Sequence, residues 1–294
     1  MQILLTGGTG FIGAALARAL RERGDVVVVV SRRASPGTDG ARTVTWEEAE
    51  AEVGRSDAVV HLAGEPIADA RWTAERLERI RSSRVDTTDR LARAVAGAPR
   101  RPRVFVSASA VGIYGMRRDD VVCDEQSSAA DDLLARMCVA WEGAAGPAKA
   151  AGVRVVHPRI GIVLGRGGAL AKMEGPFRWF LGGPVGDGKQ WLSWIHVKDV
   201  VRALLFLVDH DELSGPVNLV APAPATMNEF ARALGHALGR PSALRVPALA
   251  LRLALGDGVA ELLLTGQRVA PRRLLDAGFA FDFPALDGAL ADLQ

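Results

Sequence analysis

The chain has 294 residues, of which 49% are hydrophobic and 24% charged, and its formal net charge is +2. This composition is typical of a globular protein, and so small a charge gives no indication of a nucleic-acid or membrane partner. Two cysteines, Cys123 and Cys138, are too few for a disulfide framework or a zinc site, so we expect no metal.

Neither a membrane-spanning segment nor a leader peptide is expected. No apolar run approaches the ~20 residues that cross a bilayer. A strand expected at residues 3–5 leaves no room for a signal peptide ahead of it. We therefore expect a cytoplasmic protein.

The first thirteen residues predict a strand, a glycine turn and the start of a helix. Ile3-Leu4-Leu5 is a short apolar run, and a glycine-rich break follows at residues 6–13. Residues 14–23 are good helix formers, and Gly24 stands where a helix commonly ends. The amides that open such a helix lack partners within it, and the helix dipole favours an anion there.

Three glycines of this turn have distinct expected roles. Gly7 allows the turn, Gly10 lets the backbone approach a pyrophosphate, and Gly13 lets the helix pack closely on the strand. Because they lie between a strand and a helix, the context favours a dinucleotide site. A plain strand-to-helix turn is the alternative.

The second expected strand indicates which dinucleotide binds. Five consecutive valines end at Val30, and Ser31-Arg32-Arg33 follows. In a dinucleotide site, an acidic residue here binds the 2′-hydroxyl of NAD, whereas an arginine accommodates the 2′-phosphate of NADP. No Asp or Glu occurs between Val26 and Thr38. We predict NADP(H), bound by Ser31 and Arg32, with an exposed basic turn as the alternative.

Strands and helices alternate through the first half of the chain. This alternation predicts an α/β fold with a doubly wound parallel sheet (Rossmann) and right-handed crossovers. The expected strands are residues 3–5, 25–30, 43–45, 57–61, 104–106 and 153–157, and the expected helices are residues 14–23, 47–53, 72–96 and 131–151.

Five side chains of these elements are candidates for function. His61, on an apolar strand, is interpreted as a core histidine rather than a catalytic one. Arg84, in the long helix, either makes an exposed ion pair or reaches the cofactor phosphates. Ser107 and Ser109 follow a central strand, and Tyr114, the only tyrosine, comes shortly after. Since ligands bind outside the carboxyl ends of such strands, these hydroxyls are candidates to meet a substrate carbonyl.

Beyond residue 165 glycine, proline and aromatic residues replace the alternation. We expect residues 1–165 to form an NADP-binding domain, with its sheet completed by segments around residues 196–220. Residues 166–294 are expected to form a smaller substrate lobe with a C-terminal extension, folded over the carboxyl edge of the sheet. An aromatic stretch at residues 179–194 is expected to shape the pocket, and a strand is expected at 217–219. One expected helix ends near residue 208, and three others span residues 226–238, 249–255 and 286–293. A capping box of Thr226 and Glu229 is expected to begin the helix at 226–238.

These motifs together resemble the extended, atypical short-chain dehydrogenases/reductases. More narrowly, the chain is similar to the NAD-dependent epimerase/dehydratase-like subfamily that carries its own C-terminal extension. The matching segments are residues 6–13, 62–67, 83–84, 107–115, 141–142, 161–168, 195–200 and 267–271. The resemblance implies NADP(H) as cofactor, bound by Gly7, Thr9, Gly10, Phe11, Ile12, Gly13, Ser31, Arg32, Leu62, Ala63, Gly64, Arg84, Ser107, Arg159 and Val163.

The chain departs from the family at its chemistry. The wider family uses a helical Tyr-x-x-x-Lys pair, in which the tyrosine transfers a proton and the lysine lowers its pKa and holds the ribose. Here Leu134 and Cys138 occupy those two positions, while Ser109 remains at the serine position. Tyr114 is the remaining acid, with a packed loop tyrosine as the alternative. Cys138 as a nucleophile and His196 as a base are less favoured than structural roles.

Two hypotheses follow. The first is an NADP(H)-dependent oxidoreductase or epimerase that acts on a small carbonyl or hydroxyl compound, with Ser109 and Tyr114 as catalytic residues, as a monomer or homodimer. The second is a non-catalytic NADP(H)-binding sensor that reports the cofactor's redox state through movement of the C-terminal lobe. The missing pair favours the second, whereas Ser109 and a full substrate lobe favour the first.

Overall fold

A parallel sheet forms the centre of the molecule. The structure, a computed structural model, describes residues 1–31 and 41–294. Within those ranges the sheet runs in the order β12 (Gly215–Leu219), β8 (Arg154–Ile160), β5 (Val104–Ser107), β4 (Ala58–His61), β1 (Gln2–Thr6), β2 (Val26–Val30) and β3 (Arg42–Val44), with β6 (Ser109–Ala110) beside β8. The strand order reverses at β1, and ligands of open α/β sheets bind at such a point.

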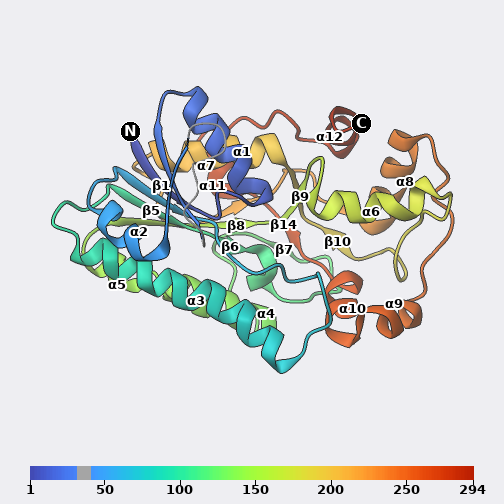
Figure 1. Ribbon diagram of the computed structural model, residues 1–294. Coiled ribbons are helices and arrows are strands. Elements are labelled where there is room, and N and C mark those ends of the chain that lie inside the picture. The colour runs from blue at the N-terminus through green and yellow to red at the C-terminus, as the bar shows by residue number, and fades with distance from the viewer. Residues whose placement is uncertain (32–40) are drawn as a thin grey trace.

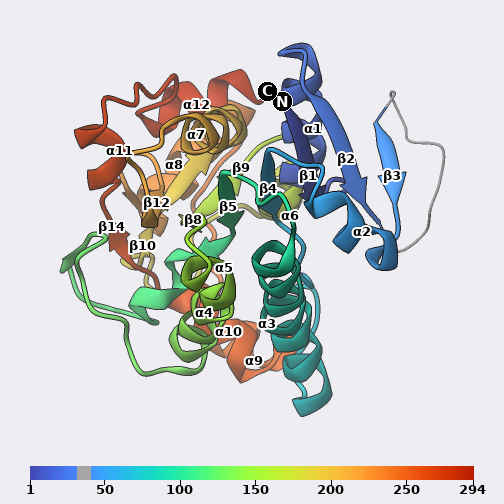
Figure 2. The same cartoon turned by 90° about the vertical axis from the view of Figure 1, so that its left-hand side faces the viewer.

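Successive side chains of each strand enter different cores. Ile3 and Leu5 of β1 pack with Leu16, whereas Leu4 packs with Leu91 on the other face. A strand that is apolar at every position is therefore buried on both faces. One face is covered by α1 (Phe11–Glu22), α7 (Val197–Asp209) and α11 (Arg272–Asp276), and the other by α2 (Trp46–Val53), α3 (Ala74–Gly97), α4 (Leu133–Gly143) and α5 (Gly146–Ala150) (Figures 1 and 2).

The doubly wound sheet expected from the sequence is confirmed. All six strands expected in the first half are present, and the strand expected at residues 217–219 is β12, which completes the sheet at its edge. The first helix begins at Phe11, directly after Gly10, rather than at the expected residue 14. Gly24 follows that helix with φ of +90°, a conformation that glycine adopts without strain.

The prediction of one helix over residues 131–151 is wrong. The chain forms α4 and α5, separated by a turn at Ala144 and Ala145. Gly143 and Gly146 are poor helix formers, and Pro147 has no amide hydrogen to donate within a continuous helix. Pro147 instead lies in the first turn of α5, where the missing donor is tolerated.

The second half of the chain builds a lobe beside one end of the sheet (Figure 1). A separate core cluster joins its helices to short two-stranded ladders. The Thr226/Glu229 capping box is present, as expected. Three helices of the lobe, α6, α10 and α11, were not expected. The elements are β7 (Val122–Cys123), β9 (Ile162–Leu164), α6 (Gly168–Arg178), β10 (Trp191–Leu192), β11 (Trp194–His196), β13 (Ala225–Thr226), α8 (Met227–Leu238), α9 (Ala248–Leu255), α10 (Asp257–Leu264), β14 (Arg268–Val269) and α12 (Leu286–Asp292).

The C-terminal extension is held to the start of α7. The buried carboxylate of Asp199 accepts backbone hydrogen bonds from Asp282 and Phe283, each of 2.9 Å. The ring of Phe283 lies 3.9 Å from that of His196, centroid to centroid. The His196 segment therefore holds the extension in place. The boundary at residue 165 remains a prediction, as does the substrate role of the lobe.

No helix among the described residues is both long enough and apolar enough to cross a membrane.

Candidate functional site

The glycine turn after β1 leaves no room for side chains. A Cβ at Gly7 would lie 2.8 Å from the amide nitrogen of Ala63, and one at Gly13 only 2.1 Å from the carbonyl oxygen of Gly7. Gly7 also has φ of +72°. The amide of Gly10 donates to the Gly7 carbonyl at 2.9 Å and closes the turn. Geometry thus requires glycine at Gly7 and Gly13, whereas a Cβ at Gly10 would be a tight contact, 3.2 Å from the Gly7 carbonyl oxygen.

No side chain among residues 1–31 and 41–294 caps the amides that open α1. Gly10 occupies the N-cap position and makes no side-chain hydrogen bond. Thr9 and Gly10 are exposed, and Phe11 and Ile12 are half-buried. The ring of Phe11 packs against the turn at residues 165–168, and a Cβ at Gly165 would lie 2.5 Å from the Phe11 Cζ. An uncapped helix start at the switch point of the sheet fits the diphosphate of a dinucleotide.

The loop after β4 is pinned on both sides. The amide of Ala63 donates to Thr6 Oγ1 at 3.3 Å, and that of Glu65 donates to Ser83 Oγ at 2.9 Å. Leu62 lies against Gly7, and Gly64 is exposed. These bonds hold the expected cofactor residues Leu62, Ala63 and Gly64 next to the glycine turn.

His61 is a core histidine, as the sequence indicated. It is fully buried, with Thr6 Oγ1 at 2.5 Å from Nδ1 and Thr87 Oγ1 at 3.2 Å from Nε2. Because the Thr87 hydroxyl donates to the Ser83 carbonyl, it accepts from Nε2, and Nδ1 accepts from Thr6. Burial, together with the charge of Arg84, lowers the pKa of His61 to about 3. The ring is therefore neutral at physiological pH.

Of the two residues expected to select the 2′-phosphate, the structure describes Ser31, which follows β2. The amide of Ser31 donates to the Val44 carbonyl at 2.9 Å, which places Ser31 at the carboxyl edge of the sheet. Arg32 lies outside the described residues. The preference for NADP(H) over NAD(H) therefore remains a prediction from the sequence.

A buried polar network connects Ser109 to Tyr114. Ser109 donates to Glu142 Oε1 at 2.7 Å, and Arg159 donates to both carboxylate oxygens at 2.8 and 2.9 Å. Arg159 also donates to the Tyr114 hydroxyl at 3.0 Å, which in turn donates to Asn218 Oδ1 at 2.7 Å. These five residues come from β6, α4, β8, η2 (Val111–Tyr114) and β12.

The network fixes the state of Tyr114. Its side chain is 1% exposed, and its hydroxyl already has a donor and an acceptor. Burial raises the pKa of Tyr114 to about 12, although the charge of Arg159 acts in the opposite direction. The neighbouring cation that an acidic tyrosine would need is present, but burial outweighs its effect.

Leu134 and Cys138, at the positions of the missing tyrosine and lysine, pack against a neighbouring segment of the chain. A Cβ at Gly112 would lie 3.9 Å from Leu134 Cβ and 3.8 Å from Cys138 Sγ, so both side chains pack against η2. Burial raises the pKa of Cys138 to about 12, with the Glu142 carboxylate adding to the effect. The thiol is therefore protonated at neutral pH, which disfavours it as a nucleophile.

The remaining expected residues lie around this network. Ser107 is fully buried, and its Oγ has no hydrogen-bond partner among the described residues. Val163 is half-buried in β9 and packs against the sheet core. Arg84 projects from α3 toward Gly64. No group of three or more potential metal ligands occurs within the described ranges.

Two members of the network were not predicted as site residues. Glu142 was expected only as part of the segment 141–142 that matches the family, although a carboxylate beside Trp141 on an amphipathic helix was a usable signal. Asn218 is the single polar residue in the apolar run Val217-Asn218-Leu219, and a fully buried amide requires partners. It also donates to the Ala270 carbonyl at 3.0 Å, which connects the network to the C-terminal extension.

A doubly wound sheet with a glycine turn and an uncapped helix start at its switch point defines a dinucleotide-binding α/β protein. The chain belongs to the NAD dependent epimerase/dehydratase family, which it matches over residues 3–220. Residues 246–293 match a domain of unknown function, DUF1731. The resemblance to an epimerase/dehydratase-like subfamily with its own extension is thus confirmed.

Relatives are similar over nearly the whole chain. The epimerase family protein ML0860 of Mycobacterium leprae is 42% identical, covering 98% of this chain and 94% of its own length. The crystal structure of human epimerase family protein SDR39U1 (isoform 2) with NADPH has a TM-score of 0.92 at 39% identity, covering 100% and 99% of the two chains. The nucleoside-diphosphate sugar epimerase of Corynebacterium glutamicum has a TM-score of 0.81 at 33% identity, and the match covers all of this chain and 58% of that one.

Proposed function

We propose that this protein is an NADP(H)-dependent oxidoreductase or epimerase-like enzyme that acts on a small carbonyl or hydroxyl compound. The uncapped glycine turn supports a dinucleotide, and the structure of human SDR39U1 with NADPH supports the phosphorylated form. In this proposal residues 1–165 hold the cofactor and residues 166–294 form the substrate lobe.

In this proposal, different segments of the chain bind different parts of the cofactor. The amides of residues 11–13 would bind the diphosphate, and Ser31 and Arg32 would bind the 2′-phosphate. The loop Leu62-Ala63-Gly64, held by hydrogen bonds to Thr6 and Ser83, would contact the cofactor between its diphosphate and its nicotinamide. When bound, the nicotinamide supplies the hydride. Ser107, Arg159 and Val163 would complete the cofactor site, with the stretch from Arg159 to Val163 near the nicotinamide.

The hydrogen bond from Ser109 to Glu142 is the observation that carries a catalytic assignment. A substrate hydroxyl that donates to Ser109 Oγ would extend a proton path to the Glu142 carboxylate. Arg159 holds that carboxylate by two hydrogen bonds, and Tyr114 holds Arg159. We assign Ser109 to substrate contact and Tyr114, with its raised pKa, to the support of Arg159.

Single-turnover oxidation of bound NADPH against a panel of aldehydes and ketones tests the proposal. We expect Ser109→Ala to slow the reaction by about 100-fold and Tyr114→Phe by much less. Ser82→Ala is the matched control, because the hydroxyl of Ser82, on α3, donates to the Arg79 carbonyl and has no other partner in the described part of the chain. Equal rates for Ser109→Ala and the wild type would refute the catalytic assignment.

The packed state of Leu134 and Cys138 favours one second candidate, a non-catalytic NADP(H) sensor. Absence of turnover with every compound, together with unchanged NADPH affinity in both variants, would favour this alternative.

A further inference from the structure

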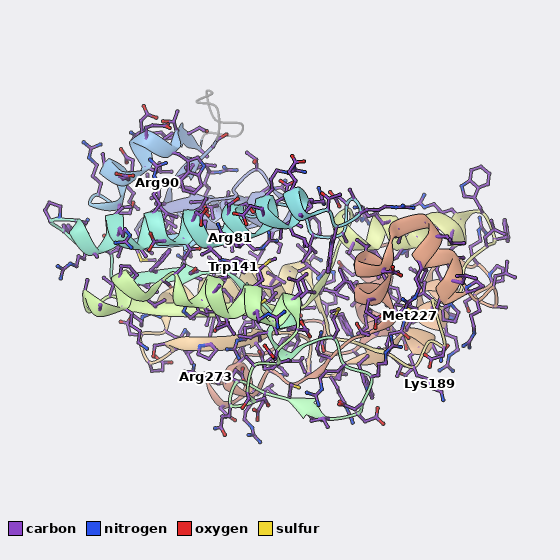
Figure 3. The ribbon with its side chains drawn as sticks, turned by 90° about the horizontal axis from the view of Figure 1, so that it is seen from below. Arg81, Arg90, Trp141, Lys189, Met227 and Arg273 are labelled. Atoms are coloured by element: carbon purple, nitrogen blue, oxygen red, sulfur yellow. The ribbon has the colours of Figure 1, made fainter. Side chains whose placement is uncertain are left out.

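The loop between β4 and α3 connects the glycine turn with the lobe. Its first residues lie against the turn, where a Cβ at Gly7 would be 2.8 Å from the carbonyl carbon of Leu62. From there the chain runs toward α10 before α3 begins (Figure 1). In the view from below, Arg81 lies nearer to the lobe than Arg90 does, so α3 begins at the end that faces the lobe (Figure 3). The loop thus crosses from the sheet to the lobe.

Both ends of this loop are fixed. At the end nearer the sheet, the amides of Ala63 and Glu65 donate the hydrogen bonds described above. At the end nearer the lobe, Arg71 donates to the Ala254 carbonyl of α9 at 3.3 Å, and the ring of Trp72 packs against the start of α10. Movement of the loop is therefore restricted to the residues between these two anchors.

The middle of the loop, Ala68-Asp69-Ala70, is held weakly. All three residues are exposed, and within the described ranges they make no backbone-to-backbone hydrogen bond. Their one polar contact in that part of the chain is the ion pair of Asp69 with Lys172 of α6, whose side chains are 48% and 63% exposed. An exposed ion pair contributes little to stability. This stretch can therefore open locally while both ends of the loop stay in place.

Lys172 belongs to a helix that also contacts the glycine turn. The first turn of α6 lies against the ring of Phe11, the residue that begins α1, and a Cβ at Gly168 would be 3.1 Å from Phe11 Cδ1. The Asp69–Lys172 pair therefore joins two segments that both touch the turn. Together the turn, the loop and α6 form a closed ring of chain beside the uncapped amides of α1.

We propose that residues 68–70 form a gate to the cofactor site and that the Asp69–Lys172 ion pair closes it. The inference rests on the proposed function, because it requires NADP(H) at the glycine turn. In the closed state the ring of chain encloses the cofactor, which enters and leaves only when the ion pair breaks. Because the pair is exposed and weak, the gate slows exchange of the cofactor without preventing it.

Stopped-flow measurements of NADPH fluorescence test the gate through the rates of binding and release. A gate that opens more often speeds entry and exit by the same factor. We therefore expect Asp69→Asn and Lys172→Met each to raise both rate constants by about threefold and to leave Kd unchanged. The reversed pair, Asp69→Lys with Lys172→Asp, should restore the wild-type rates.

Asp89→Asn is the matched control for the change at Asp69. Asp89 pairs with Arg93 at 2.7 Å on the surface of α3, so the control removes an exposed ion pair of similar kind outside the loop. We expect this variant to bind and release NADPH at the wild-type rates.

Three results would overturn the gate. Unchanged rate constants in Asp69→Asn and Lys172→Met would show that the ion pair does not control exchange. Faster release without faster binding would weaken Kd and would show that the two residues support the bound cofactor or the fold. A reversed pair that exchanges NADPH as fast as the single variants would show that attraction between the two charges does not close the loop.

The gate and the proposed function fail in different ways. A wild-type protein without saturable NADPH binding would refute the cofactor assignment, and the gate with it. A wild-type protein that binds NADPH, with any of the three results above, would refute the gate alone.

Discussion

Replacement of Glu142 by glutamine should expose how strongly the buried network depends on one carboxylate. Glu142 accepts hydrogen bonds from Ser109 and from two nitrogens of Arg159, and the two charged side chains are 15% and 9% exposed. Glu142→Gln keeps the shape but leaves the Arg159 charge without a counter-ion. Breaking a buried pair in this way costs about 3 kcal/mol or more. For a chain of this size that corresponds to a fall in Tm of roughly 5 °C.

Urea denaturation and thermal melting of purified variants measure this loss. The control is Glu50→Gln, because Glu50 pairs with Arg90 at a similar distance of 2.8 Å but at the surface, with 52% and 41% exposure. An exposed pair contributes about 0–1 kcal/mol. Removal of both buried partners, with Arg159→Met added, should cost less than the sum of the two single changes. Losses below about 1 kcal/mol for both Glu142→Gln and Glu50→Gln would refute the reasoning.

Three further predictions follow from the site. Gly13→Ala should abolish saturable NADPH binding in a titration, because the new Cβ would lie 2.1 Å from the Gly7 carbonyl oxygen. A variant that binds NADPH as tightly as the wild type does would contradict binding of the diphosphate at the glycine turn. Arg32→Ala should weaken NADPH binding far more than NADH binding, by about tenfold or more, and an equal loss would show that the 2′-phosphate assignment is wrong. The pKa of His61 is lowered to about 3 in the folded state, so the unfolded chain binds an extra proton below its ordinary pKa near 6.5. The stability that the neutral ring provides is present above pH 6.5 and is lost as pH falls toward 3, at about 1.4 kcal/mol per pH unit. His61→Gln should therefore flatten the dependence of the free energy of unfolding on pH, as measured by urea denaturation. An unchanged slope would contradict a neutral buried ring.

The sheet is predictable because the apolar pattern of its strands indicates their burial. The valine run at Val26–Val30 is apolar at every position, as is typical of a strand covered on both faces, and four of its five residues, Val27 to Val30, are buried. The glycine turn is equally predictable, since its context lies within thirteen consecutive residues. The split of the expected helix at residues 131–151 was also visible in Gly143, Gly146 and Pro147, but a strong apolar pattern on both sides obscured it.

The polar network is not predictable in the same way. Tyr114 and Asn218 meet across 104 positions of sequence, and Ser109 and Glu142 across 33. Such contacts depend on strand order and on the direction of each side chain, and neither is encoded in local periodicity. The protonation of Tyr114 likewise depends on how completely it is buried. A charged neighbour could be anticipated from the sequence, but the balance between its field and desolvation could not.

The contact between Asp199 and the backbone at Asp282 and Phe283 has a consequence for how the chain can be divided. A carboxylate that is fully buried depends on those two amides, and both belong to the last stretch of the polypeptide. Loss of that stretch would leave a charge inside the protein with two of its donors gone. Of the described partners of Asp199, the ion pair with Arg202 at 3.0 Å would remain. Removal of residues 282–294 is therefore expected to destabilise α7 and the face of the sheet that α7 covers.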